Sequence, residues 1–324
     1  MLVNFLIVVV LLVVIYLGIR VTIKTSWIRK AVLKWPVMLF SGLITLIFFA
    51  AAALILVGYA KLNLSPYRYP ARDVKIDITP ERVSRGEKMA HICADCHSSA
   101  GQPPLDGSRT NILAGGLPLG ELYASNLTPG GPLKDWTDAE ILRALREGVD
   151  NRDRPLVVMP SGALHYASDE DIYALVAYLR SQPAVENDLP DRSMSPLAAL
   201  MVGAGMFPTS AQTPILEPIV APSLGTEEYG AYLAASLGCG DCHGPDLAGM
   251  EPGAGPGGPN LTAIVPLWQE SQFIRLFREG LDPSGRKVDD GMPWDNYGQA
   301  LDDAALKDLY RYLSGLQRIE KSSE

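Results

Sequence analysis

Two copies of the pattern C-x-x-C-H use all four cysteines of this 324-residue chain: Cys93-Ala-Asp-Cys96-His97 and Cys239-Gly-Asp-Cys242-His243. This spacing is typical of covalent c-type haem attachment, in which both thiols bond to the haem vinyl groups and the adjacent histidine ligates the iron. A disulfide or thioredoxin-like site would not require the histidine. The pairs are separated by residues 97–238, far more than a zinc ribbon allows. We therefore expect two covalent haems, held by these four cysteines and two histidines.

The N-terminal region contains two apolar runs without a charge, 2–19 and 37–60. Runs of this length can span a bilayer as helices. The first run could instead be a cleaved signal peptide, although it lacks a basic start and a small-residue cleavage site. The loop between the runs carries only basic charges, which the positive-inside rule assigns to the cytoplasm: Arg20, Lys24, Arg29, Lys30 and Lys34. The sequence thus predicts a two-helix anchor in a lipid bilayer over residues 1–60, with everything after residue 60 outside.

The rest of the chain repeats itself. Asn126-Leu-Thr128 matches Asn260-Leu-Thr262, and Arg146-Glu-Gly148 matches Arg278-Glu-Gly280. The first copy has a longer Gly- and Pro-rich segment after its haem motif, within residues 98–125. These matches predict a linker over 61–80, a first domain over 81–183, a connection over 184–224 and a second domain over 225–320.

Helical periodicity dominates both copies, and strand signals are nearly absent. A helix is expected before each haem motif, over 83–92 and over 227–237, with Thr226 as an N-cap. A middle helix should follow Trp136-Thr137, and a last helix should begin near Ser168 in the first copy and at Asp302 in the second. The expected fold class is all-α, with two transmembrane helices followed by two tandem domains.

This helix order around a C-x-x-C-H motif resembles the class I cytochrome c fold, over 81–183 and again over 225–320. The resemblance implies that a methionine before the last helix supplies the second axial ligand of each haem. The matching residues are Met159 and Met292, each followed by proline. A packing role is the alternative for either methionine, and His165 is an alternative ligand to Met159.

The connecting segment and the Asn126-Leu-Thr-Pro129 turn are similar to those of cytochrome subunits of bacterial membrane dehydrogenases. That group typically has three haem motifs and a C-terminal anchor, whereas this chain has two motifs and apolar runs at its N-terminus. The layout also resembles the dihaem subunit of cbb-type oxidases. Both resemblances imply haem domains on the periplasmic or extracellular side of the bacterial inner membrane.

These features favour a non-catalytic relay that passes single electrons within a respiratory or photosynthetic membrane complex. Its partner would be a quinol-oxidising complex, a terminal oxidase or a photosynthetic complex. Two alternatives stay open: an electron-accepting subunit of a periplasmic dehydrogenase, and a dihaem redox enzyme such as a peroxidase. No catalytic residue is nominated.

Acidic residues outnumber basic ones by 36 to 28 in the whole chain, which argues against nucleic acid as a partner. The excess is concentrated after residue 224, where 16 acidic residues face 8 basic ones. We therefore expect the second domain to reach outward on its long connection and to receive a basic soluble redox protein, with Asp302, Asp303 and Asp308 contributing to the acidic surface.

Overall fold

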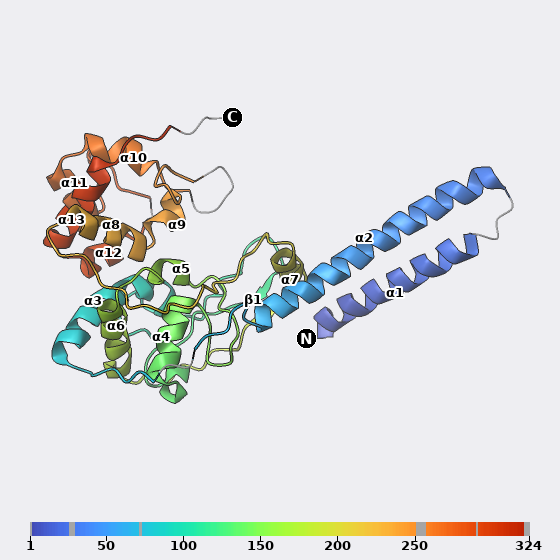
Figure 1. Ribbon diagram of the computed structural model, residues 1–324, viewed down its shortest axis with the longest axis horizontal. Coiled ribbons are helices and arrows are strands. Elements are labelled where there is room, and N and C mark those ends of the chain that lie inside the picture. The colour runs from blue at the N-terminus through green and yellow to red at the C-terminus, as the bar shows by residue number, and fades with distance from the viewer. Residues whose placement is uncertain (1, 26–29, 71–72, 251–256, 290, 321–324) are drawn as a thin grey trace.

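The structure is a computed structural model that describes residues 2–25, 30–70, 73–250, 257–289 and 291–320. Two long N-terminal helices project from a body of shorter helices (Figure 1). The long helices are α1 (Leu2–Thr25) and α2 (Ala31–Asn63). One small sheet occurs among the described residues, an antiparallel pair of β1 (Gly120–Glu121) and β2 (Ser193–Met194). The mostly helical fold is as expected from the sequence.

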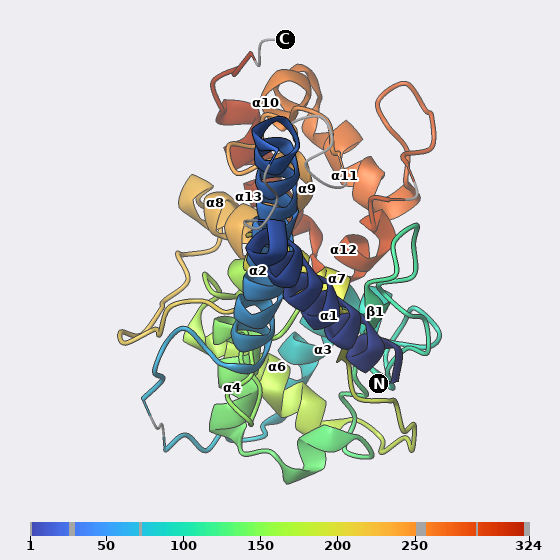
Figure 2. The same ribbon diagram turned by 90° about the vertical axis from the view of Figure 1, so that its right-hand side faces the viewer.

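Helices α1 and α2 lie side by side as a hairpin (Figures 1 and 2). Thr22 Oγ1 lies 2.9 Å from Ser41 Oγ, and Gly18 lets the helices meet at Thr45. The outer face of α2 exposes large apolar side chains, including Leu39, Phe40, Leu46, Ile47 and Phe49. Among the described residues, one helical stretch is long and apolar enough to cross a membrane, Val32–Asn63 of α2. The side chains of residues 2–8 lie outside the described part, so the first span, 2–19, stays a prediction.

The first unit, residues 80–185, consists of α3 (Pro80–His97), α4 (Asp138–Glu147), α5 (Ser161–Leu164) and α6 (Asp169–Ser181), with a 3-10 turn over Pro132–Asp135. Helix α3 packs across α6, and Gly86 permits the close approach because a Cβ there would lie 2.0 Å from the carbonyl oxygen of Ala174. Ile172, Leu175 and Val176 of α6 are fully buried in the core of this unit. The expected helices are present, although α3 is longer than predicted and includes the haem motif.

The second unit, residues 227–319, consists of α8 (Glu227–Ser236), α9 (Cys239–His243), α10 (Leu261–Ile264), α11 (Glu270–Glu279), α12 (Trp294–Ala300) and α13 (Asp303–Gly315), with a 3-10 turn over Val265–Leu267. Helix α8 packs across α13 as α3 packs across α6. Gly230 takes the place of Gly86, since a Cβ there would lie 2.0 Å from the carbonyl oxygen of Asp308. Leu306, Leu309 and Phe273 form a core of its own.

Polar side chains fix where many of these helices begin. In each case a side-chain oxygen accepts a hydrogen bond from the backbone N–H three residues later, a contact worth about 1 kcal/mol. The residues are Thr79, Thr137, Ser168, Ser195, Thr226, Asn260 and Asp302. The predicted N-cap at Thr226 and the predicted helix starts at Ser168 and Asp302 are thereby confirmed.

The connection between the units does not extend freely. The N–H groups of Ser210 and Gln212 donate to carbonyl oxygens of Leu156 and Glu147, and Asp169 N–H donates to the carbonyl of Ile219. Helix α7 (Pro196–Gly203) packs against α2. Backbone hydrogen bonds therefore hold the connection along the first unit, and the expected outward reach of the second unit stays a prediction.

Candidate haem sites

Cys93, Cys96 and His97 form the last turn of α3. Residues three and four apart lie on one face of a helix, so the two sulfurs can approach the same edge of a planar group. His97 Nδ1 lies 2.8 Å from the carbonyl oxygen of Ser125. A carbonyl oxygen only accepts, so Nδ1 carries the proton and Nε2 keeps its lone pair. An imidazole held in this way is ready to ligate a metal through Nε2.

The second motif occupies the short helix α9, which starts after Gly238 in a left-handed conformation (φ 75°). His243 Nδ1 donates to the carbonyl oxygen of Pro259 at 2.8 Å. Gly258 packs against the ring, because a Cβ there would lie 2.6 Å from His243 Nδ1. Both motifs therefore present a histidine whose Nδ1–H is held by the backbone and whose Nε2 keeps its lone pair for iron.

None of the four cysteines, all of which lie within the described residues, is paired in a disulfide. Burial raises the pKa of Cys93 and of Cys239 to about 12. A thiol with so high a pKa is a poor thiolate nucleophile, which is unlike the reactive cysteine of a redox enzyme. Burial also lowers the pKa of His97 and of His243, which favours the neutral imidazole that metal ions require. The donor set fits haem c better than a thiol-based active site.

The two candidate axial methionines lie at equivalent places. Met159 packs against the core of the first unit together with Cys93, and Met292 packs against the core of the second together with Cys239. Val158, directly before Met159, has φ 65°, a conformation that β-branched residues rarely adopt. Such backbone strain costs on the order of 1–3 kcal/mol and is concentrated at functional sites. The ligation of iron by Met159 and Met292 remains a prediction.

The other candidates have partners within the protein. His165 Nδ1 lies 3.1 Å from the carbonyl oxygen of Arg146, so its Nε2 also keeps a lone pair and it stays the alternative to Met159. One of the three acidic residues predicted to form a surface for a basic partner is buried. Asp308 is only 2% exposed and holds the Gly225 N–H and Arg311, so its place on an acidic surface is wrong.

The hydrogen bonds around the two motifs recur in pairs. Gly107 N–H donates to the carbonyl of His97, as Gly249 N–H donates to that of His243. In both Asn-Leu-Thr turns the Asn amide donates to, and the Thr hydroxyl accepts from, the backbone after the last helix; the paired residues are Asn126 and Asn260, and Thr128 and Thr262. In the loop after each middle helix an Arg donates to an Asp four residues earlier; these pairs are Arg154 with Asp150, and Arg286 with Asp282. The sequence repeat is thus also a repeat of contacts.

In each unit the first helix, α3 or α8, contacts the short helix that follows the candidate axial methionine of the other unit. Helix α12, which follows Met292, lies against α3, and α5, which follows Met159, lies against α8. Gln102 Nε2 donates to Asn296 Oδ1 at 3.4 Å, and a Cβ built on Gly238 would lie 3.3 Å from the Cβ of Ala163. This reciprocal contact was not predicted from the sequence, because the helical periodicity of one unit carries no information about which surface of the other unit it contacts.

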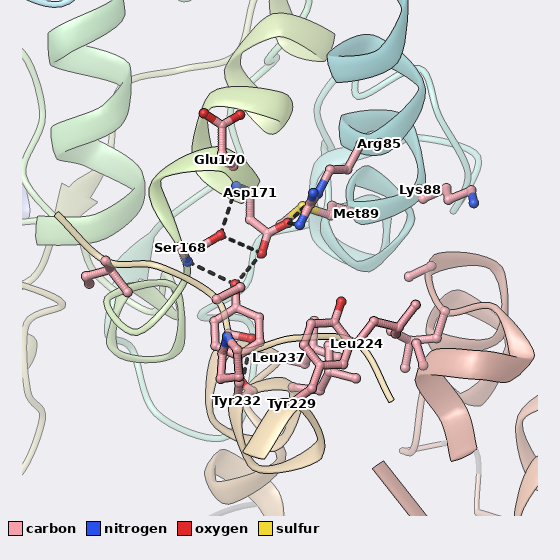
Figure 3. Close-up of a pocket in the computed structure, with 18 of the residues that line it drawn as sticks. Arg85, Lys88, Met89, Ser168, Glu170, Asp171, Leu224, Tyr229, Tyr232 and Leu237 are labelled. Atoms are coloured by element: carbon pink, nitrogen blue, oxygen red, sulfur yellow. Dashed lines mark hydrogen bonds and ion pairs between the residues drawn. The ribbon is translucent and has the colours of Figure 1, made fainter. Parts of the chain in front are cut away.

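A polar cluster centred on the buried carboxylate of Asp171 joins the units beside a cavity of about 760 Å³ (Figure 3). Asp171 of α6 accepts hydrogen bonds from Tyr232 of α8 and from the Ser168 hydroxyl, and it forms a 2.6 Å ion pair with Arg85. With Gly86 matched to Gly230 and Tyr178 to Tyr312, Arg85 corresponds to Tyr229 and Asp171 to Ala305. The sequence signal for this cluster is that the first unit has a charged residue at both positions and the second unit has an uncharged one.

Comparison with known proteins identifies a family for the second unit: residues 227–317 match the model of the cytochrome c family. One of the subunits of nicotinate dehydrogenase from Pseudomonas putida is 34% identical over 194 residues, which cover 53% of this chain and 15% of that protein. The fructose dehydrogenase cytochrome subunit of Gluconobacter japonicus is 24% identical over 271 residues, which cover 75% of this chain and 54% of that subunit. The chain spans about half or less of the length of these relatives.

The cytochrome c match includes Cys239, Cys242 and His243, the residues whose geometry fits covalent haem. A domain of this family binds haem c through such a motif. Residues 227–317 therefore form a cytochrome c domain, a fold that carries covalent haem c, in a chain homologous to two dehydrogenase subunits, one of which is a cytochrome subunit.

Proposed function

We propose that this chain is a membrane-anchored dihaem cytochrome c that accepts electrons from a dehydrogenase partner and relays them one at a time. The observation that carries the proposal is the paired geometry of His97 and His243. Each donates Nδ1–H to a backbone carbonyl at 2.8 Å and keeps the Nε2 lone pair for iron at the end of a C-x-x-C-H helix.

The first unit supports the count of two haems. It repeats the glycine contact between its first and last helices, the carbonyl that holds the histidine, and the Asn-Leu-Thr turn of the second unit. We assign Cys93, Cys96 and His97 to one haem, and Cys239, Cys242 and His243 to the other. Both units, 81–183 and 225–320, are then cytochrome c domains in tandem.

The second axial ligands would be Met159 and Met292. A haem iron with two axial protein ligands exchanges single electrons and leaves no position for a substrate. Occupation of both axial positions by His and Met therefore favours electron relay over a peroxidase-like activity.

The names of the relatives favour a dehydrogenase complex over the oxidase or photosynthetic complexes that the layout also suggested. Both relatives are dehydrogenase subunits, and one of them is a cytochrome subunit. The donor would thus be a separate catalytic chain, and the acceptor a quinone-linked or soluble redox partner.

The exposed apolar face of α2 supports anchoring in the bacterial inner membrane. The basic residues before it favour the periplasmic side for the haem units. A helix face that exposes many Leu and Phe side chains is favoured in the hydrocarbon core of a bilayer over water.

Haem counting tests the central claim. We expect the purified chain to carry two covalent haems by pyridine haemochrome absorbance and by intact mass. A variant with both Cys93 and Cys96 changed to Ser should keep one, and so should the matched Cys239 and Cys242 variant. One haem in the unmodified chain would reduce the proposal to a monohaem cytochrome. Purification in mild detergent should recover a catalytic dehydrogenase chain; recovery of oxidase subunits instead would contradict the assigned partner.

A further inference from the structure

The first unit differs from the second by an insertion next to the membrane helix. Residues 98–125 follow the first haem motif, whereas only residues 244–259 separate the second motif from its Asn-Leu-Thr turn. Part of the insertion forms β1, which pairs with β2 in the connection. The inserted Leu113 and Leu122 join a separate apolar core with Ile55 and Leu62 of α2. The insertion therefore contacts the anchor.

Helix α7 completes this contact. A Cβ built on Gly58 would lie 1.7 Å from the carbonyl oxygen of Ala199, and one on Gly203 would lie 2.0 Å from that of Leu54. The backbones of α2 and α7 thus touch directly, the close packing that small residues allow between membrane helices. Lys61 Nζ donates to the carbonyl oxygen of Val202 at 3.5 Å. These contacts fix α7 against the last turns of α2.

The contact lies at the level where α2 would leave the lipid. A hydrocarbon core of ordinary thickness takes about 20 helical residues. Counted from Lys34, the last basic residue before the apolar run, the core ends near residue 55. Residues 54–62, which contact α7 and the insertion, therefore lie at the outer boundary of the bilayer.

Two uncharged segments meet α2 there: 111–119 from the insertion and 196–207 from the connection. They expose apolar side chains, with Ile112 38%, Leu117 53% and Met206 71% accessible. The shorter segment of the second unit, by contrast, contains Asp246 and Glu251. Apolar side chains beside a membrane helix, without charges among them, suit the headgroup region of a bilayer.

We propose that residues 111–119 and 196–207 form a membrane-surface patch that inserts into the outer leaflet around α2. The occupant of this patch is the phospholipid bilayer itself. The inference rests on the proposed membrane anchor. Together with the α2–α7 contact, the patch would hold the first haem unit in a fixed orientation on the membrane.

Fluorescence quenching by lipids tests the patch. Leu117→Cys and Met206→Cys would be labelled with bimane in the full haem-loaded chain and reconstituted in phosphatidylcholine vesicles. Lipids brominated near the headgroup should quench both labels. Val220→Cys and Leu267→Cys are matched controls, because these side chains are apolar and 84% and 81% exposed but lie outside both segments. Their labels should not be quenched.

A label at Ile47→Cys, on the exposed face of α2 and within the hydrocarbon core, is measured with lipids brominated deep in their acyl chains and separates the two possible failures. If lipid quenches the label at residue 47 but not those at 117 and 206, the patch is wrong and the anchor stands. If none is quenched, the anchor is wrong and the patch with it. Equal quenching at 117, 206, 220 and 267 would also overturn the patch, since it would show that the whole protein adsorbs to lipid.

Discussion

The hydroxyl of Tyr232 in the second unit donates a hydrogen bond to the carboxylate of Asp171 in the first. The same hydroxyl accepts from the Ser168 N–H at 2.9 Å, so one phenol group completes the start of α6 from outside its own unit (Figure 3). Burial and the nearby carboxylate of Asp171 raise the pKa of Tyr232 to about 12. The phenol is therefore neutral and available as a donor at physiological pH.

Replacement of Tyr232 by Phe should loosen the contact between the units. Hydrogen bonds to charged groups contribute about 1.5–3 kcal/mol, so we expect a loss of that size in the free energy of unfolding. Hydrogen exchange should also show weaker protection of the Ser168 amide. Tyr229→Phe is the control, because among the described residues the Tyr229 hydroxyl has no hydrogen bond. An equal effect of both variants would contradict the role of Tyr232.

The same pair predicts a difference at high pH. A group whose pKa is raised in the folded state stabilises the protein below its unfolded pKa, and that contribution is lost as the pH rises through the folded value. For Tyr232 the loss should fall between pH 10.0 and about 12. Urea unfolding across this range should show a steeper loss of stability in the unmodified protein than in Tyr232→Phe. Parallel curves would contradict the raised pKa.

Met159→Ala and Met292→Ala should each open one haem iron to carbon monoxide, because each removes a proposed axial ligand. The measurement is the optical spectrum of the reduced protein under carbon monoxide. Met89→Ala is the control, since Met89 packs against the same core as Met159 but lies on α3. Stoichiometric binding of carbon monoxide to the unmodified protein would overturn the relay and indicate an enzymatic site.

Gly86→Ala and Gly230→Ala should both destabilise the protein, although alanine alone favours a helix over glycine by about 1 kcal/mol. The added Cβ would overlap a carbonyl oxygen of the facing helix in each unit. Overpacking of this kind costs typically about 1–3 kcal/mol. Thermal unfolding measures the change, and Gly115→Ala is the control because no atom lies near its Cβ position. If only one of the two substitutions is tolerated, the packing of α3 on α6 is not equivalent to that of α8 on α13.

Reporter fusions test the direction of the anchor. A fusion within residues 20–36 should be cytoplasmic and a fusion after residue 324 should be exported, because basic loops are retained inside. Sequencing the mature N-terminus provides the control. A terminus between residues 20 and 30 would show that the first apolar run is removed, which would leave a single anchor helix.

Much of each unit could be predicted because its signals are local. The N-caps at Ser168, Thr226 and Asp302 are single polar residues before an apolar helical face, and the structure has them where the sequence placed them. Each haem motif is likewise recognisable from five consecutive residues. The direct contact of α7 with α2 was not visible, because it depends on two backbones meeting at Gly58 and Ala199. Asp308 was misplaced for a related reason, since composition counts a carboxylate without showing that it is buried.

The reciprocal contacts between the two units also constrain which substitutions the chain can accept during evolution. Two units with a shared sequence repeat ordinarily diverge independently, yet here Asn296 of the second unit is bonded to Gln102 of the first, and Ala163 packs against Gly238. A bulkier side chain at residue 163 would press on the turn that carries the second haem motif. In related chains, residues 102 and 296 should therefore vary together, and residue 163 should stay small wherever both haem motifs are retained.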